Sequence, residues 1–456
     1  MIFPLDLFFG AECGIIIYYH EIGILCDIKN PYCMISLYSI ASYPKGRVYI
    51  LKYFVLIPDG MADTPVPSLG NRTPMEAAHK PAMDALAAKS LCGRVLNVPD
   101  GMVPESDTAN LAILSYDPRT YSKGRSPLEA MSQGLYMSPA DTALRCNFVT
   151  LSGDAETDVY EERVILDHSS DEITTAEAAE LVKALNEALP MPGRVLHTGV
   201  SYRHCLLWEN ASETYNFMRP HDILGRVIGD YLPKADNGGA EFLAYMKEGA
   251  KILEHHPVNE ARRARGLRPA NSPWLWSPGK KPALPSFPEK WGVRAAIISA
   301  VDLIKGIGIC ANCDVIDVEG ATGNFATNYT GKANAAMDAF ENGCDLVYVH
   351  VEAPDECGHR GEADVKAAAI EKIDALILAP VLEYLEKSGE DFRILVLPDH
   401  PTPIAIRTHS SEPVPFFLYD SAKTETGVDT YTEASCAAKE LYIPDGSTLL
   451  SHMIRK

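Results

Sequence analysis

Carboxylate and imidazole side chains follow three apolar segments of this sequence, each near the point where the apolar run ends. Asp355 and His359 are four residues apart, and His400 directly follows Asp399. Mixed carboxylate and imidazole ligands suit Zn²⁺ or Mn²⁺ better than Ca²⁺. The pattern therefore predicts a site for two divalent metal ions, Mn²⁺ or Zn²⁺ first and Mg²⁺ as an alternative. The predicted ligands from these segments are Asp59, Asp355, His359, Asp399, His400 and His409.

A serine lies at the start of a predicted helix that begins near Ser106 or Asp107. A helix N-terminus favours an anion, and a serine hydroxyl beside a metal ion loses its proton easily and becomes a nucleophile. Taken alone, such a serine is more often only a helix cap. Paired metal ions clamp the displacement of a phosphoryl group, so the ordered set predicts phosphoryl transfer with Ser106 as catalytic residue and metal ligand.

The elements that must position these side chains alternate between strand and helix. Apolar runs predict strands at 53–57, 294–301, 345–354 and 393–397, and a strand pair at 197–210. Apolar residues at helical spacing predict helices at 74–90, 171–189 and 363–389. This alternation predicts an α/β fold whose sheet is mixed but mostly parallel and is flanked by helices.

The composition is that of an ordinary globular protein of 456 residues, with 46% hydrophobic and 22% charged residues. A net charge of −20 argues against nucleic acid or an anionic membrane as a partner. The 11 cysteines have no framework spacing, which favours reduced thiols and a cytoplasmic location. No signal peptide or membrane span is expected, and the sequence predicts no oligomeric state.

Two stretches differ from the rest of the chain. Residues 1–50 have apolar patches, no Lys or Arg before Lys29 and none of the motifs, so we expect a leader outside the main domain. Residues 267–288 are dense in Pro and Gly and are expected to mark a domain junction.

From Leu51 onward, a series of motifs in order resembles the cofactor-independent phosphoglycerate mutases of the archaeal type, within the alkaline phosphatase superfamily. The motifs are DGMAD, SDTANLAILSYDP, GRSPLEA, LRCNF, DLIKGIG, GATGNFATNYTGKA, VHVEAPDECGH and PDHPTP. The resemblance implies interconversion of 3-phosphoglycerate and 2-phosphoglycerate through a phosphoserine at Ser106, without 2,3-bisphosphoglycerate.

The resemblance also implies how the site and the domains are divided. Asp355, His359 and His409 would hold one metal ion, and the second would be held by Asp59, Ser106, Asp399 and His400. An alkaline-phosphatase-like domain would comprise 51–137 and 281–456. A smaller α/β domain, inserted at 138–280, would bind the substrate.

Substrate phosphate and carboxylate need cationic partners, for which arginine is well suited. The candidates are Arg125, Arg145, Arg203, Lys305 and Lys332, each of which could equally be a solvated surface residue. His221 could act on a substrate proton or only cap a turn.

Two departures from the family pattern keep other activities open. "RVILDHSSD" (163–171) lacks the expected arginine-rich stretch, and Pro401 stands where a small polar residue is usual. These features resemble a subgroup proposed to be homoserine kinases. The alternatives are therefore a related metal-dependent phosphotransferase of that kind or a phosphatase, although the chain has no P-loop motif.

Overall fold

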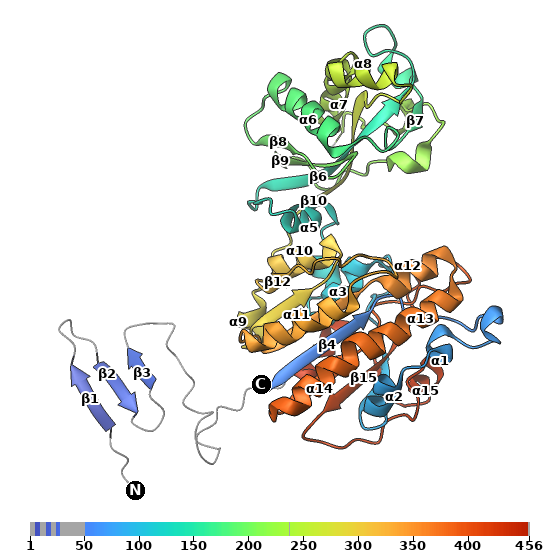
Figure 1. Cartoon of the computed structure of the whole chain (residues 1–456). Coiled ribbons are helices and arrows are strands. Elements are labelled where there is room, and N and C mark those ends of the chain that lie inside the picture. The colour runs from blue at the N-terminus through green and yellow to red at the C-terminus, as the bar shows by residue number, and fades with distance from the viewer. Residues whose placement is uncertain (1–4, 10–14, 20–23, 28–50, 237, 455–456) are drawn as a thin grey trace. The chain divides into compact units, whose positions relative to one another are not determined.

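The computed structural model describes residues 5–9, 15–19, 24–27, 51–236 and 238–454 (Figure 1). The chain separates into two compact units, Met1–Leu51 and Lys52–Lys456. In the first, β1 (Leu5–Phe9), β2 (Ile15–Tyr19) and β3 (Ile24–Asp27) form an antiparallel sheet. The expected leader, residues 1–50, falls in this unit, and most of it lies outside the described residues.

An eight-stranded sheet forms the centre of the second unit (Figure 1). Only β15 runs against its neighbours, so the predicted α/β class with a mixed, mostly parallel sheet is confirmed. The apolar runs predicted as strands at 53–57, 294–301, 345–354 and 393–397 are buried in this sheet, because helices cover both of its faces. The strands in spatial order are β12 (Asp314–Ile316), β11 (Ala295–Ile298), β13 (Leu346–Val351), β4 (Lys52–Pro58), β14 (Phe392–Val396), β15 (Val414–Asp420), β5 (Leu91–Val95) and β16 (Tyr442–Ile443).

The helices around this sheet follow the predicted periodicity with two interruptions. The segment 74–90 forms α1 (Pro74–Ala77) and α2 (Pro81–Ala87), since Pro81 cannot continue a helix from the preceding turn. The segment 363–389 forms α13 (Ala363–Ile373) and α14 (Ala379–Ser388), joined by a π-helical turn (Asp374–Leu378). The others are α3 (Ser106–Ile113), α4 (Pro118–Tyr121), α5 (Ser126–Ser132), α9 (Phe287–Trp291), α10 (Asp302–Cys310), α11 (Tyr329–Glu341), α12 (Ala353–Arg360), α15 (Glu433–Ala437) and α16 (Leu450–Met453).

A second, antiparallel sheet lies within residues 141–280 and has its own core around Phe148, Phe242 and Trp274. Thr174 caps α6 with a capping box to Glu177. The strands are β6 (Asp141–Leu151), β7 (Ile165–Asp167), β8 (Arg194–His197), β9 (Arg203–Glu209) and β10 (Ser272–Lys280). The helices are α6 (Thr175–Ala188), α7 (Gly239–Glu254) and α8 (Pro257–Ala264).

The Pro-rich stretch 267–288 is not a plain linker, because β10 occupies its middle. β10 is an edge strand, where proline is tolerated because the missing N–H is not needed by a second neighbour. The antiparallel strands fall within the segment expected as an inserted domain, but the division into domains stays a prediction. Among the helices of the described residues, none has the length and apolar character needed to cross a membrane.

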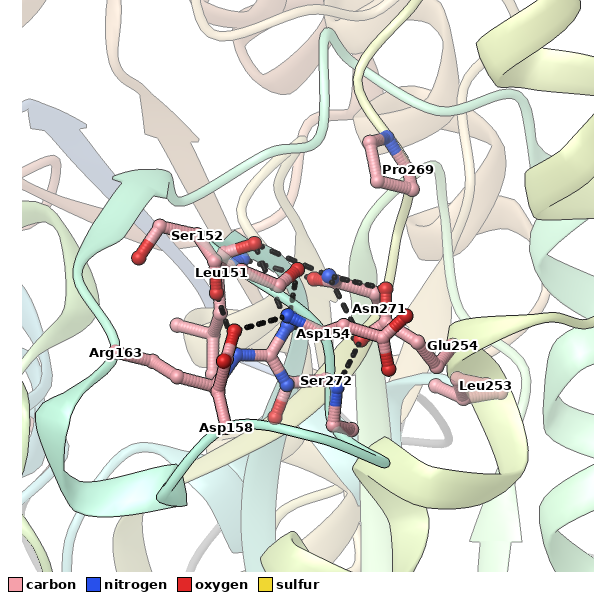
Figure 2. Close-up of polar contacts among 12 residues, drawn as sticks. Leu151, Ser152, Asp154, Asp158, Arg163, Leu253, Glu254, Pro269, Asn271 and Ser272 are labelled. Atoms are coloured by element: carbon pink, nitrogen blue, oxygen red, sulfur yellow. Dashed lines mark hydrogen bonds and ion pairs between the residues drawn. The ribbon is translucent and has the colours of Figure 1, made fainter.

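Figure 2 shows a buried ion pair in the core of this second sheet. Arg163 Nη2 lies 2.8 Å from Glu254 Oε2, and each side chain is only 1% exposed. Asn271 Nδ2 and the Ala155 backbone N–H also donate to Glu254, and Arg163 Nε donates to the Ser152 carbonyl. The carboxylate thus joins the loop after β6 to the end of α7.

Replacing Glu254 with leucine is expected to lower the free energy of unfolding by about 3–5 kcal/mol, because Arg163 would remain buried without its counterion. Urea unfolding measures the effect. The double variant Arg163→Met/Glu254→Leu should recover part of the loss, since it removes the buried pair, while Arg263, the second partner of Glu254, is partly exposed and keeps its ion pair with Glu260. Glu383→Ala, which breaks an exposed ion pair with Lys387, is the matched control and should change little. A Glu254→Leu protein as stable as its parent would contradict this account.

Candidate active site

Three adjacent strands of the large sheet end at one edge and deliver most of the predicted ligands there. β13 and β14 both pair in parallel with β4, so their carboxyl ends are neighbours. Asp59 follows β4 directly, and Asp399 and His400 follow β14 after a short turn. Helix α12 starts immediately after β13 and presents Asp355 and His359 one turn apart on the same face.

The deeper cluster consists of Asp59, Asp399 and His400, whose ligand atoms all lie within 4.8 Å of one another. All three residues are buried. Asp399 accepts hydrogen bonds from the backbone N–H groups of Gly60 and His400 and from Asn110 Nδ2, which fixes its orientation. Asp59 Oδ1, by contrast, is buried and has no hydrogen-bond partner among the described residues.

Two buried carboxylates this close repel each other when both are ionised. Burial, followed by the charges of Asp399 and Asp355, raises the pKa of Asp59 well above its usual value. A divalent cation would relieve this repulsion and satisfy the unpartnered Oδ1, so the donor set fits a metal ion.

The outer cluster brings together Asp355, His400 and His409, again within 4.8 Å. His359 belongs beside it, with Nε2 lying 2.9 Å from His409 Nε2 and 3.2 Å from Asp355 Oδ2. Nδ1 of His359 lies 3.0 Å from the Arg407 carbonyl, and Nδ1 of His409 lies 2.7 Å from the Pro104 carbonyl. Because a carbonyl oxygen only accepts, each Nδ1 carries a proton in the neutral ring, and both Nε2 lone pairs face one another.

Facing lone pairs need a cation between them, either a proton or a metal ion. The hydrogen bond to Asp355 raises the pKa of His359 to about 9, so a proton fills this role at neutral pH when no metal ion does. The geometry fits a second metal ion held by carboxylate and imidazole. His400 belongs to both clusters, because its ring lies within 4.8 Å of the ligand atoms of each. The resemblance to the mutases implied that it belongs to the deeper cluster alone.

The first residue of α3 is Ser106, and its Oγ lies 3.2 Å from His400 Nε2. The N-cap residue is Glu105, and no side chain caps this helix. The alternative that Ser106 serves as a helix cap is therefore wrong. Its hydroxyl is directed to the ligand cluster, at a helix end where backbone N–H groups favour an anion.

A buried ion pair supports the two ligand loops from behind. Lys366 Nζ lies 2.7 Å from Asp63 Oδ2 and donates to the Thr402 carbonyl at 2.8 Å, and the Lys366 and Asp63 side chains are fully buried. Thr402 Oγ1 donates to Asp355 Oδ1 at 2.5 Å. The loop after β4 and the loop after β14 are thereby held together around the site.

Glu433 accepts hydrogen bonds from the Asp63 backbone N–H and from Thr73 Oγ1 in the same buried network. Burial raises the pKa of Glu433 to about 7. In the unfolded chain the pKa of Glu433 is near 4.3. Between about pH 4.5 and 7 the folded chain therefore binds more protons than the unfolded chain, and the free energy of unfolding falls as pH rises through this range. The effect should be on the order of 1–3 kcal/mol.

Glu433→Gln is expected to remove this part of the pH dependence, because the amide stays neutral and keeps the shape of the acid. Urea unfolding at pH 5.5 and pH 8 should show a smaller loss of stability in the variant than in the parent chain. Equal losses in both proteins would show that Glu433 is ionised throughout.

Comparison with known proteins shows which family this chain is related to. A family profile described as 2,3-bisphosphoglycerate-independent phosphoglycerate mutase matches residues 87–259. A curated protein of that name from Methanosarcina mazei is 46% identical over 409 residues, which is 89% of this chain and all of the relative. Another from Methanothrix thermoacetophila is 44% identical over 405 residues, with the same coverage of both chains. The chain belongs to this mutase family.

Solved structures agree with the assignment to the mutase family. The cofactor-independent phosphoglycerate mutase of Thermoplasma acidophilum aligns with a TM-score of 0.64 and 28% identity, covering 89% of this chain and 99% of that one. A protein of Pyrococcus horikoshii aligns with a TM-score of 0.73 and 28% identity, covering 89% and 97%. The resemblance expected from the motifs, and with it an isomerase of this family, is confirmed.

The five cationic candidates for substrate binding have different surroundings. Lys332 is 1% exposed and its Nζ donates to the His350 carbonyl at 2.7 Å, so it is no surface residue. Lys305 pairs with Asp317 at 2.6 Å. Arg125 Nη1 lies 3.4 Å from Glu105, next to Ser106, and its buried Nε has no partner among the described residues.

Arg145 and Arg203 line a cavity of about 330 Å³ on the antiparallel sheet. Arg145 is already paired with Glu129 of α5 and lies over the Trp276 ring. Arg203 forms no ion pair with any described residue and so offers a free guanidinium. His221, which the sequence left open as a proton carrier or a turn cap, also lines this cavity.

His204 lines the same cavity and was not anticipated from the sequence. Its Nδ1 accepts the Gly199 backbone N–H, so in the neutral ring Nε2 carries the proton, and this buried Nε2 has no partner among the described residues. Burial lowers the pKa of His204 to about 3, which keeps the ring neutral. Its position beside Arg203 in the predicted strand is the one signal that the sequence offered.

Two further side chains at the ligand cluster were missed. Asn110, one turn after Ser106 on α3, donates to Asp399 at 2.9 Å, and the i, i+4 spacing from Ser106 could have indicated it. His350 lies 3.3 Å from Asp59, and its signal was a lone histidine inside the apolar run of β13.

Proposed function

We propose that this chain interconverts 3-phosphoglycerate and 2-phosphoglycerate through a phosphoserine at Ser106. The observation that carries the proposal is the position of Ser106 Oγ, 3.2 Å from His400 Nε2, at a helix start beside two carboxylate and imidazole clusters. The names of the relatives supply the substrate, because each is described as a phosphoglycerate mutase.

Two divalent metal ions, Mn²⁺ or Zn²⁺, fit the clusters. One would be held by Asp355, His359 and His409, and the other by Asp59, Ser106, Asp399 and His400. When bound, they supply positive charge that neutralises phosphoryl oxygens and lowers the pKa of the serine hydroxyl.

The nucleophile is Ser106, whose Oγ forms a bond to phosphorus while the bond from phosphorus to the glycerate oxygen breaks. Ser106 Oγ gives up its proton in this step, and the departing oxygen takes up a proton and becomes a hydroxyl. In the return step the other hydroxyl of the same glycerate gives up a proton and attacks the phosphoserine, which frees Ser106 Oγ. The two steps together move one phosphoryl group between two hydroxyls of glycerate, so no second phosphate donor is needed.

Glycerate must stay bound between the two steps, and the cavity on the antiparallel sheet supports this role. Arg203 lines the cavity and forms no ion pair with a described residue, so its guanidinium can pair with a carboxylate. Arg125, one residue before the cavity-lining Ser126 and paired with Glu105, is suited to the phosphate. Closure over the substrate would exclude water, which otherwise hydrolyses the phosphoserine.

The direct test is an assay of purified protein with 3-phosphoglycerate and Mn²⁺, without 2,3-bisphosphoglycerate or ATP. Appearance of 2-phosphoglycerate is the expected result. A parallel assay with homoserine, ATP and Mn²⁺ distinguishes a homoserine kinase from a mutase. Release of inorganic phosphate from 3-phosphoglycerate would identify a phosphatase. Phosphohomoserine formation without isomerisation would overturn the proposal.

Arg203→Ala is expected to lower kcat/KM for 3-phosphoglycerate roughly 30- to 5,000-fold, because the carboxylate loses a charged partner. This factor corresponds to a loss of about 2–5 kcal/mol in transition-state stabilisation. Steady-state kinetics measure this effect. Arg226→Ala removes an arginine that is exposed and lies outside the cavity, and it should leave kcat/KM unchanged. Equal kinetics for the two variants would place Arg203 outside the substrate site.

A further inference from the structure

A fully buried histidine lies directly behind the deeper ligand cluster, and no step of the proposed reaction uses it. His350 is in β13, between β11 and β4, and its side chain is 0% exposed. Its Nε2 lies 3.3 Å from Asp59 Oδ2 and 3.9 Å from Asp399 Oδ2. Neither this Nε2 nor Asp59 Oδ1 forms a hydrogen bond with any described residue.

The surroundings of the ring decide which nitrogen carries the proton. Ser299 Oγ, 3.4 Å from His350 Nδ1, already accepts the Val301 backbone N–H and is free to donate its own proton to Nδ1. On the other side, Nε2 faces one oxygen each of Asp59 and Asp399, and when both acids are ionised, as metal binding requires, these oxygens can only accept. A lone pair there would be repelled, so the favoured neutral tautomer has the proton on Nε2.

The two oxygens of Asp59 have different neighbours. Oδ2 faces His350, whereas Oδ1 faces His400 Nε2 at 3.7 Å, on the side of the ligand cluster. The 3.3 Å separation is short enough for His350 Nε2–H to donate to Oδ2 after a small turn of the ring, and such a bond would hold the carboxylate with Oδ1 directed to the cluster. The Lys332 ammonium donates to the His350 carbonyl at 2.7 Å and anchors the histidine in turn.

We propose that His350 is a positioning residue for Asp59, which it orients through Nε2–H so that Oδ1 can bind the deeper metal ion. The inference rests on the two-metal site of the proposed function. Hydrogen bonds that orient metal-binding side chains typically contribute 10- to 100-fold to metal affinity. His350 would therefore act on one of the two metal ions and leave the other unaffected.

The test measures Mn²⁺ affinity rather than activity. Protein stripped with a chelator is titrated with Mn²⁺ against a fluorescent chelator, for the parent chain, His350→Leu and His350→Gln. We expect two Mn²⁺ in the parent chain, and one affinity weakened by about 10- to 100-fold in His350→Leu with the other unchanged. Glutamine offers an N–H donor near the position of Nε2 and should restore most of the loss.

Two controls separate hydrogen bonding from packing. Val349→Ala removes buried volume from the adjacent position of β13, on the opposite face of the sheet, and should leave both affinities unchanged. Ser299→Ala weakens the support of the tautomer and should weaken the same Mn²⁺ by a smaller factor. It should have no further effect in the His350→Leu background, and it provides the measurement if His350→Leu does not fold.

Pulsed EPR of bound Mn²⁺ counts directly coordinated imidazole nitrogens, and this count should be the same in parent and His350→Leu proteins at saturating Mn²⁺. A lost nitrogen would make His350 a ligand and overturn the positioning role. Unchanged affinities in His350→Leu, or His350→Gln as weak as His350→Leu, would overturn it as well. A parent chain that binds no Mn²⁺ would instead refute the two-metal site itself.

Discussion

Replacing Ser106 with alanine is expected to lower the rate of isomerisation by at least about 10³-fold, because the variant lacks the atom that accepts the phosphoryl group. It also loses a predicted metal ligand. Stability should change little, since Ser106 makes no capping hydrogen bond to α3. A near-complete loss of activity in a normally folded protein is therefore the expected result.

The measurement combines kinetics with mapping of the phosphate. Parent protein mixed with substrate and quenched in acid should yield a peptide phosphorylated at Ser106, and the Ser106→Ala protein should yield none. Ser68→Ala, at an exposed position, is the control and should behave as the parent chain. Isomerisation at a normal rate by Ser106→Ala, or a phosphate on another residue, would refute the phosphoserine mechanism.

Removal of divalent metal ions is expected to abolish activity completely and reversibly. Without them, the buried carboxylates of Asp59 and Asp399 repel each other, and the substrate phosphate meets uncompensated negative charge. Dialysis against a strong chelator should give an inactive protein, and Mn²⁺ should restore the rate. Added Mn²⁺ should also raise the Tm, because a ligand that binds only the folded chain stabilises it.

Elemental analysis provides the independent readout. The active protein should hold two equivalents of divalent metal, and an Asp59→Asn/Asp355→Asn variant should hold fewer and show no rise of Tm with Mn²⁺. A fully active protein in which no metal is found after exhaustive chelation would contradict the two-metal site.

The sequence by itself predicted which residues form the two clusters, because each residue lies at a strand end or on one helix face that a local pattern reveals. Asp59 and Asp399 each follow a strand, so pairing of parallel strands is enough to bring them together. Asp355 and His359 share one face of a helix at i, i+4 spacing. The apolar runs likewise determined the mostly parallel sheet, since strands buried on both faces have no polar alternation.

Other features depended on contacts between distant parts of the chain, which no local pattern encodes. The strand β10 was hidden by its prolines, which are acceptable only because β10 lies at the edge of its sheet. Lys332 was a candidate for substrate binding or for the solvated surface in the sequence, but it is buried and donates to the carbonyl of His350. Arg145 was a free candidate in the sequence and is paired with Glu129 in the fold.

Only the tertiary structure could show which polar side chains are buried next to the site and lack partners. His350 stands in an apolar strand and becomes informative through its 3.3 Å approach to Asp59, a residue 291 positions away. The same holds for His204, whose proton position follows from the Gly199 backbone N–H. Spacing along a strand or helix fixes what lies on one element, whereas the distance between two elements is decided by how the whole chain packs.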